Sequence, residues 1–551
     1  MQNKILTALF ATLGFCVMLS GTTPFNYVNK AFLREACIST GHRVARTMDM
    51  VQKDRWRNLI ETGKEEGGGL IADYLIVKRI HEDKKQIQTL TEKGVTNKTL
   101  PSIHVLYRDG VALARQYHLE TDIVYDYAYF LYWQKDYIAS LKLAQRLERY
   151  YENALHAEGY RKAKVYNLLG ILHKLEMHYE DAEQYYRKAI SIWQPLQQQT
   201  PVMHYEQALA NSLYNLGNLL CATQRNSQGE EMYRKAFAIR QRLAQQNPGN
   251  AACVWNLAAS YRAMGNLYRK LKHFDEAEAS LKKAIEIEER LTKKYPSVNE
   301  YVNSLGYSYC SLANLYRAKE RCLKAELNYY TANMYFGRVA ERNAAYKLDQ
   351  AYGYYCMAAN YDDMFNRNHA IKLYRRAAKL QEEVVKEYSP AILDGLHYVS
   401  SLCVLTGFAN RYWNKDEEEG AFAVHQSFPG NETSRVYIRE LADSYERLFT
   451  LQWNRADKRI VEQTGRKAVL LYELLSKETP ALYEHDLAHV KFLLGLFYAD
   501  ENRHVEAESL LQDSLRLYMN LAAKGDAEPY AERLQTLRML LHDEEEYLKE
   551  L

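Results

Sequence analysis

The chain has 551 residues, more than one compact core usually holds, which predicts either several domains or a repeat array. Apolar residues make up 47% and charged residues 26%, as in folded soluble proteins, and the 25 glycines and 10 prolines are few for this length, which favours an all-helical chain. The net charge of +3 gives no indication of nucleic-acid binding.

The eight cysteines form no CxxC pair, and most stand beside apolar residues in segments with a helical pattern. We predict that they are free, buried thiols rather than disulfides or metal ligands. Such cysteine usage is typical of a reducing compartment.

Residues 1–24 contain one lysine followed by an apolar run over residues 5–19. The run is short for a membrane span, and it fits a secretory signal peptide. We therefore predict export to the periplasm or cell envelope. The alternative is a buried first helix in a cytoplasmic protein, which the cysteines favour.

Residues 25–118 show no repeat and form a predicted N-terminal helical region. The apolar pattern predicts helices over residues 43–62, 70–91 and 102–117, and three glycines at residues 67–69 separate the first two. This region either caps the segment that follows or serves as an adaptor.

Residues 119–525 repeat a pair of amphipathic helices about nine times. One small or central residue in the first helix of each pair marks the register, at intervals of 42, 47, 48, 48, 45, 49, 42 and 46 residues. These anchor positions are Ala128, Gly170, Gly217, Gly265, Ala313, Ala358, Gly407, Phe449 and Gly495. Neither helix of a pair buries its apolar stripe alone, so the pairs must stack.

The fourth pair, residues 254–296, is the clearest copy, and its small residues Gly265 and Ala277 are predicted to lie where the two helices cross. The seventh and eighth pairs are degenerate. In the eighth, Val461 and Gly465 replace the usual small and aromatic residues. Residues 526–551 are predicted to form a C-terminal capping helix, which a stack of repeats needs at its end.

These features resemble the tetratricopeptide repeat, over roughly residues 121–517. The residues that carry the resemblance are Leu216, Gly217, Tyr233, Ala236, Met264, Gly265, Tyr268, Ala277, Leu281, Ala284 and Pro296. The long repeat is similar to those of kinesin light chains and of many bacterial repeat proteins. The resemblance implies an all-α fold, a right-handed α-solenoid of helix-turn-helix repeats whose first helices line the inside.

No catalytic signature is present, since the sequence lacks GxxxxGK[ST], GxGxxG, HExxH and GxSxG. His173 and His178 are five residues apart across a helix end, a poor geometry for metal ligands. We therefore predict that the protein is not an enzyme, uses no cofactor and holds no metal.

Polar residues at the inward-facing positions of the first helices are the candidate binding residues. An asparagine amide both donates and accepts hydrogen bonds, and arginine and lysine attract carboxylates. The predicted groove residues are Asn167, Asn211, Tyr214, Asn218, Arg262, Asn266, Arg269, Lys270, Tyr307, Asn314 and Arg317. The alternative is that the asparagines only hold neighbouring helices together. From Tyr352 onward the inner face becomes aromatic and acidic.

The sequence thus predicts a non-catalytic protein–protein interaction scaffold. Its concave groove is expected to bind an extended, acidic peptide or protein partner, as the resemblance implies, with no nucleic acid and no small-molecule cofactor. Two alternatives remain: a regulatory or oligomerising accessory module for a separate catalytic partner, and an exported glycan- or cargo-binding protein. The sequence does not identify the partner or the oligomeric state.

Overall fold

The structure, a computed structural model, describes residues 69–92, 94–116, 122–153, 159–388, 396, 435–524 and 528–550. Within these ranges the chain forms α-helices and two short 3-10 helices but no strand, so the predicted all-α class is confirmed. The predicted signal peptide, the helix expected over residues 43–62 and most of the seventh pair lie outside the described residues. No helix in the described ranges combines the length and apolar character needed to span a membrane.

The chain divides into two compact units. Unit 1 contains residues 1–93 and 98–127, and unit 2 contains residues 94–97 and 128–551. In unit 1, α4 (Gly69–Glu92) packs against α5 (Leu100–Gln116), close to the bounds expected from the sequence. The Tyr107 ring stacks on the Tyr127 ring with 4.9 Å between centroids, and Lys84 forms a salt bridge with Asp126.

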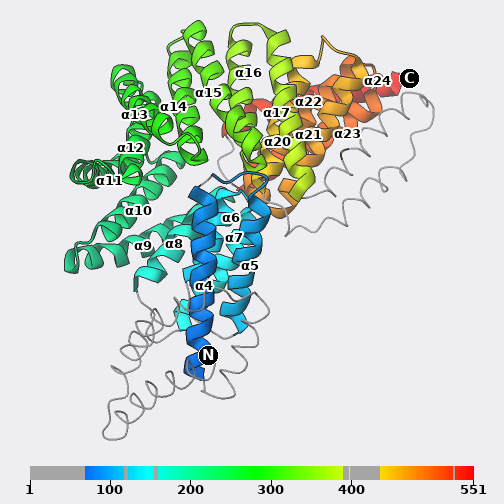
Figure 1. Ribbon diagram of the computed structural model, residues 1–551. Helices are drawn as coiled ribbons and strands as arrows, with labels where there is room; N and C mark the ends of the chain where they lie inside the picture. The colour runs from blue at the N-terminus through cyan, green and yellow to red at the C-terminus, as the bar shows by residue number, and fades with distance from the viewer. Residues whose placement is uncertain are drawn as a thin grey trace, which may run out of the picture. The chain divides into compact units, whose positions relative to one another are not determined.

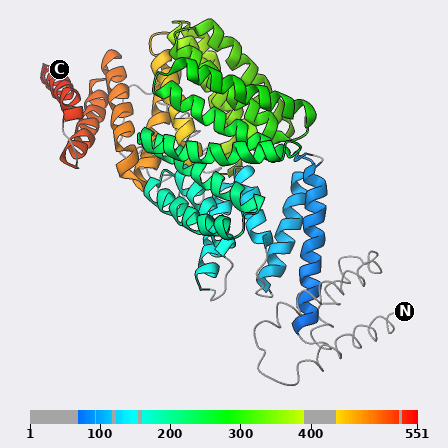
Figure 2. The ribbon, with the colours of Figure 1, turned by 90° about the vertical axis from the view of Figure 1, so that its left-hand side faces the viewer.

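Unit 2 is a stack of helix pairs, the α-solenoid that the sequence predicts. Successive pairs can be followed in Figure 1, and Figure 2 shows the same succession from another side. The first helix of each pair is α6 (Asp122–Trp133, which begins in unit 1), α8 (Gly159–Leu175), α10 (Met203–Ala222), α12 (Ala251–Lys270), α14 (Asn299–Ala318), α16 (Lys347–Asp363), α20 (Arg435–Gln452) and α22 (Pro480–Asp500). The second helices are α7 (Tyr137–Asn153), α9 (Tyr179–Gln199), α11 (Asn226–Gln246), α13 (Phe274–Lys294), α15 (Cys322–Arg342), α17 (Arg367–Tyr388), α21 (Lys458–Glu478) and α23 (His504–Lys524). After η2 (Glu528–Tyr530), α24 (Ala531–Glu550) packs on α23, where a capping helix was expected.

The order of packing shows which helices lie inside the curve. Successive first helices pack against one another, α8 with α10, α10 with α12, α12 with α14 and α14 with α16, and no comparable packing joins successive second helices in the described ranges. The first helices therefore line the inner side of the stack. α17 packs directly against α20, and most of the seventh predicted pair, which stands between them in the sequence, lies outside the described residues. The sixth and eighth predicted pairs are thus neighbours.

Close crossings explain the anchor residues. A Cβ atom added at Gly265 would lie 2.7 Å from Cγ of Leu281 and 3.2 Å from the carbonyl oxygen of Ala277, as expected for the fourth pair. In the eighth pair the roles are exchanged, because Phe449 supplies the large side chain and Gly465 the space, with 2.9 Å between the Phe449 ring and a Cβ added at Gly465. The degenerate pair therefore packs by the same rule.

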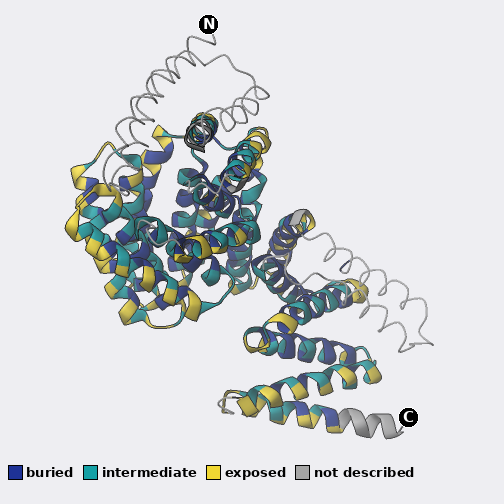
Figure 3. Ribbon diagram, turned by 90° about the horizontal axis from the view of Figure 1, so that it is seen from below, coloured by how far each residue is buried: buried dark blue, intermediate teal, exposed yellow. Residues whose placement is uncertain are grey.

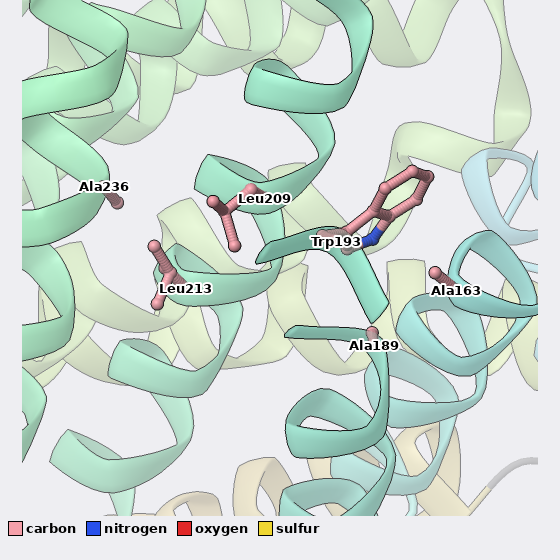
Figure 4. Packing of buried hydrophobic residues seen from close by; sticks show 6 residues of the cluster. All are labelled: Ala163, Ala189, Trp193, Leu209, Leu213 and Ala236. Atoms are coloured by element: carbon pink, nitrogen blue, oxygen red, sulfur yellow. The ribbon is translucent and has the colours of Figure 1, made fainter. Parts of the chain in front are cut away.

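A core shared between neighbouring pairs holds the stack together. Figure 4 shows one such cluster, in which Trp193 of α9 is 1% exposed and packs with five smaller residues of α8 to α11. Figure 3 shows the buried residues between helices and the exposed ones on outer surfaces and turns. The five described cysteines are free and four of them are buried, which confirms the prediction for this part of the chain.

All but one of the described turns within a pair contain a residue in the left-handed backbone region. These residues recur with the register of the anchors, at Lys135, Met177, Gln224, Lys272, Glu320, Phe365 and Asn502, with φ between 56° and 65°. The turn between α20 and α21 is the exception. In the others the N–H of the next residue donates to the carbonyl five residues earlier, which ends the first helix in a Schellman motif.

The turns of the first two pairs contact helices far along the chain. The Asn343 amide donates to the Gln134 side chain at 2.8 Å, and Lys135 forms a salt bridge with Asp349 with 3.3 Å between Nζ and Oδ1. In the next turn, the His178 ring accepts a hydrogen bond from Arg435 at 3.0 Å. The solenoid thus curves far enough for its first turns to meet the opposite edge of its later pairs.

Candidate functional site

The predicted groove residues lie on four adjacent first helices, α8, α10, α12 and α14. We call the inward side of these helices the inner wall. Most of the predicted side chains form hydrogen bonds or ion pairs within the protein, whereas Arg269 has none among the described residues, and its Nε is buried without a hydrogen-bond partner. The unused donors and charges define what a ligand could contact.

The three equivalent asparagines, Asn218, Asn266 and Asn314, each use one end of the side-chain amide. Oδ1 of Asn218 accepts from the Tyr233 hydroxyl at 2.7 Å, and Oδ1 of Asn314 accepts from the Tyr329 hydroxyl at 2.6 Å. Nδ2 of Asn266 donates to the Ser311 hydroxyl at 3.2 Å. The Nδ2 groups of Asn218 and Asn314 and the Oδ1 of Asn266 have no protein partner within the described ranges, so they retain hydrogen-bonding capacity.

Asn167 and Asn211 are engaged between helices. Oδ1 of Asn167 accepts from Ser212 at 3.0 Å and from Asn215 at 3.2 Å, which joins α8 to α10. Oδ1 of Asn211 accepts from Arg240 of α11 at 2.9 Å. The Arg240 guanidinium also lies over the Tyr214 ring, 4.3 Å from its centroid. These three predicted residues, Asn167, Asn211 and Tyr214, therefore hold pairs together, as the alternative reading of the asparagines expects.

Two predicted basic residues are neutralised by carboxylates. Nη1 of Arg262 donates to Glu288 at 3.0 Å and to the Ser304 carbonyl and hydroxyl, joining α12, α13 and α14. Burial raises the pKa of Glu288, and Arg262 opposes that shift. Arg317 forms a two-pronged salt bridge with Asp363, at 2.5 and 3.2 Å. Neither side chain offers an uncompensated positive charge to a ligand.

Three basic residues of the inner wall lack a carboxylate partner within the described ranges: Lys174 of α8 and Arg269 and Lys270 of α12. We call them the basic cluster. Lys270 donates to the Cys221 carbonyl at 3.1 Å. Burial raises the pKa of the Cys221 thiol, and the charges of Lys270 and Lys174 lower it, so both lysines lie near this residue. Burial lowers the pKa of Lys174.

Tyr307 belongs to the contact with the first turn rather than to the open wall. Its hydroxyl donates to Asp349, the same carboxylate that Lys135 pairs with, and burial raises the pKa of Tyr307 far above its ordinary value. The sequence could not reveal this engagement, because Lys135 and Tyr307 are far apart along the chain. Arg240 was missed for a related reason, since it lies on a second helix and reaches the wall from behind.

Carboxyl groups also occur on the first helices of the later pairs. On α20, Asp443 and Glu446 both accept the Tyr472 hydroxyl, at 2.7 and 3.0 Å. Burial raises the pKa of both carboxyl groups. Arg439 and Arg447 oppose the shift at Asp443, so basic side chains lie close to these carboxyl groups. The acidic inner face expected from Tyr352 onward stays a prediction.

The histidines of the second turn lie closer than their spacing suggested. One ring nitrogen each of His173 and His178 and a carboxylate oxygen of Asp181 lie within 4.8 Å of one another, so the expected poor geometry was wrong. However, Arg435 donates to Nε2 of His178 and places a positive charge beside the group. This arrangement opposes cation binding, and we assign no metal to it; the predicted lack of a metal stays a prediction.

Fold and inner wall together define a helical-repeat protein. Two family models, both described as tetratricopeptide repeat, match residues 163–192 and 208–290. The chain therefore contains tetratricopeptide repeats, and the matched residues form helices α8 to α13 of the solenoid.

Comparison with solved structures finds similar helical-repeat chains at low identity. A Rap protein complexed with competence and sporulation factor is 12% identical, covers 85% of this chain and 99% of its own, and has a TM-score of 0.40. The apo quorum sensor NprR of B. thuringiensis is 14% identical, with 72% and 99% coverage and a TM-score of 0.35. A thermophilic tetratricopeptide-repeat protein of Thermus thermophilus is 19% identical, with 41% and 95% coverage and a TM-score of 0.26. Comparison with curated proteins finds no match.

Proposed function

We propose that the inner wall binds an extended, acidic segment of a partner protein. The main support for this proposal is the basic cluster of Lys174, Arg269 and Lys270. No carboxylate in the described ranges forms a salt bridge with these residues. Charges of this kind on a concave surface attract and orient carboxylates. The proposed site is narrower than the set predicted from sequence, because Arg262 and Arg317 are already paired.

The second part of the proposal is that Asn218, Asn266 and Asn314, which we call the asparagine row, bind the backbone of the ligand. Asn218, Asn266 and Asn314 follow one another on α10, α12 and α14 and keep two donor groups and one acceptor for a ligand. An extended peptide presents backbone carbonyl and amide groups in alternation, which such a row can bind without reading its side chains. Charge would then select acidic segments, and the row would hold the backbone.

The experiment is fluorescence anisotropy with labelled synthetic peptides of equal length that differ only in their number of acidic residues. We expect affinity to rise with acidic content and to fall with added salt. The double variant Arg269→Gln/Lys270→Gln should weaken binding of the most acidic peptide by about tenfold or more. Arg290→Gln is the matched control, because Arg290 lies on the outer helix α13 and pairs with Glu286 at 3.6 Å.

A second variant set tests the asparagine row separately. Replacing Asn218, Asn266 and Asn314 together with alanine should weaken acidic and neutral peptides by similar factors, since the row contacts the backbone. Circular dichroism would establish that the fold is intact. Unchanged affinity in a folded triple variant would reject the asparagine row, and equal affinity for acidic and basic peptides would reject the basic cluster.

A further inference from the structure

The second helix α15 differs from the other second helices in its outward face. Leu323, Leu327, Tyr330 and Met334 are 74%, 68%, 65% and 55% exposed, respectively. Their spacing of four, three and four residues places them on one side of the helix, in a line about 16 Å long. We call these four residues the α15 stripe, and α15 is labelled in Figure 1.

The repeat itself provides the internal comparison. At the equivalent positions, α13 has Asp275, Ala279, Lys282 and Glu286, α11 has Ser227, Glu231, Arg234 and Ala238, and α17 has Asn368, Lys372, Arg375 and Lys379. The shared fold therefore does not require apolar residues at these positions. Four exposed large apolar side chains in one line indicate a contact surface rather than scattered exposure.

We propose that the α15 stripe is the contact between two copies of this chain, packed antiparallel across a two-fold axis. A spacing of four, three and four is symmetric about its own midpoint. An antiparallel second copy therefore places Leu323 opposite Met334 and Leu327 opposite Tyr330, twice over. A two-fold contact requires such self-complementarity, whereas a different partner would not.

Charges at the two ends of the stripe support the same arrangement. Glu320 in the turn before α15 and Arg338 on the helix are both exposed, and neither has a salt-bridge partner within the described ranges. They lie almost equally far from the stripe midpoint on either side. In the antiparallel pair, the turn that contains Glu320 in one copy lies at the end of the stripe where Arg338 of the other copy stands. Two symmetric Glu320–Arg338 ion pairs follow.

The small size of the contact sets its strength. A stable interface buries about 800 Å² on each partner, and one helical stripe provides less than that. The dimer should therefore be weak, with dissociation in the micromolar range. The contact between the two copies lies on the outer side of the solenoid and leaves the inner wall open.

The test is sedimentation equilibrium of the full chain across the micromolar range. We expect a monomer–dimer equilibrium, and Leu327→Glu should raise the dimer dissociation constant by about 30-fold or more. Ala279→Glu is the matched control, since Ala279 holds the equivalent exposed position on α13, and it should leave the equilibrium unchanged. A chain that is monomeric throughout, or a dimer indifferent to Leu327→Glu, would overturn the proposal.

A charge swap tests the antiparallel arrangement. Glu320→Arg and Arg338→Glu should each weaken the dimer, because each places like charges together at both ends. The double variant should restore the original dissociation constant, since the ion pairs are re-formed with reversed signs. A dimer that depends on Leu327 but is not rescued by the double variant would overturn the two-fold antiparallel packing.

Discussion

The turn between α6 and α7 and the turn between α12 and α13 have the same backbone and different surroundings. Lys135 and Lys272 hold equivalent positions, with φ of 65° and 61°. In each turn the next N–H donates to the carbonyl five residues earlier, at 2.9 and 2.8 Å. However, Lys272 is exposed, whereas Lys135 is bonded to the buried carboxylate of Asp349.

The difference shows how position along a solenoid changes the role of a repeated residue. Burial alone would lower the pKa of Lys135, but the Asp349 carboxylate more than reverses this effect and leaves the pKa raised. Because the solenoid curves back on itself, its first turns meet later helices. The turn of the fourth pair remains at the surface. One lysine therefore ties two distant parts of unit 2 together, and the other is solvated.

The largest expected effect comes from the two lysine-to-alanine variants. Lys135→Ala should lower the free energy of unfolding by about 3 to 5 kcal/mol, because it removes the positive charge that is paired with the buried Asp349 carboxylate and leaves only hydrogen bonds to neutral groups. Lys272→Ala should change it by less than about 0.5 kcal/mol, as expected for an exposed surface residue. Urea unfolding followed by circular dichroism measures both.

A double-variant cycle isolates the ion pair. Lys135→Ala combined with Asp349→Asn removes both charges, so its destabilisation should be smaller than the sum of the two single variants. Tyr307 and Asn303 also contact the Asp349 carboxylate, and both residues are unchanged in all variants of the cycle. If Lys135→Ala cost no more than Lys272→Ala, the first turn would not be a structural tie.

The second effect is a pH dependence near the buried turn. Burial raises the pKa of Glu440 from 4.5 to about 7, with Asp349 adding to the shift and Arg439 and Lys135 opposing it. Since the folded-state pKa lies above the unfolded one, the stabilising contribution is complete below about pH 4.5 and is lost as the pH rises through about 7. Glu440→Gln should therefore be about 1 to 3 kcal/mol more stable than the wild type at pH 8.

The same variant should gain little or nothing at pH 4.5, where Glu440 is protonated in the wild type as well. Thermal unfolding at both pH values measures the difference. Lys272→Ala serves as the reference, because its turn contains no buried carboxylate pair and its effect should not change with pH in this range. Equal gains for Glu440→Gln at the two pH values would show that charge is not the cause.

The smallest expected effects are those of alanine substitutions at two helical glycines, Gly265 and Gly337. Gly265→Ala places a Cβ 2.7 Å from Leu281, and the strain should outweigh the gain in helix propensity by about 1 to 2 kcal/mol. Gly337→Ala meets only the flexible end of Gln350, at 3.0 Å, and should stabilise by up to about 1 kcal/mol. Urea unfolding of both variants gives the sign, and a neutral Gly265→Ala would show that the crossing tolerates a methyl group.

The register of the repeat could be predicted because its cause is local. A small residue at each crossing, such as Gly265, and the left-handed turn residue that follows it at a constant spacing recur at the same intervals in sequence and structure. The eighth pair shows the limit of position-by-position comparison. Phe449 and Gly465 exchange the usual roles, and the packing constraint applies to their summed volume rather than to either residue.

The candidate site was predicted only in part. The spacing placed the asparagines and basic residues on adjacent first helices, but it could not tell whether Arg262 and Arg317 were free. Their partners, Glu288 and Asp363, follow 26 and 46 residues later, and only the packing of α12 to α16 brings them together. The predicted domain boundaries and groove contacts stay predictions.

The sequence by itself determined the helical class, the paired repeat and the anchor positions, because helix periodicity and close crossings act between residues near one another in the chain. The tertiary structure alone decided which charges remain unpaired, which turn is buried and which outer helix presents an apolar stripe without a partner. These features depend on how far the stack curves and on which helices become neighbours. Each pair adds a small part of the curvature, and only the sum over many pairs brings Lys135 to Asp349.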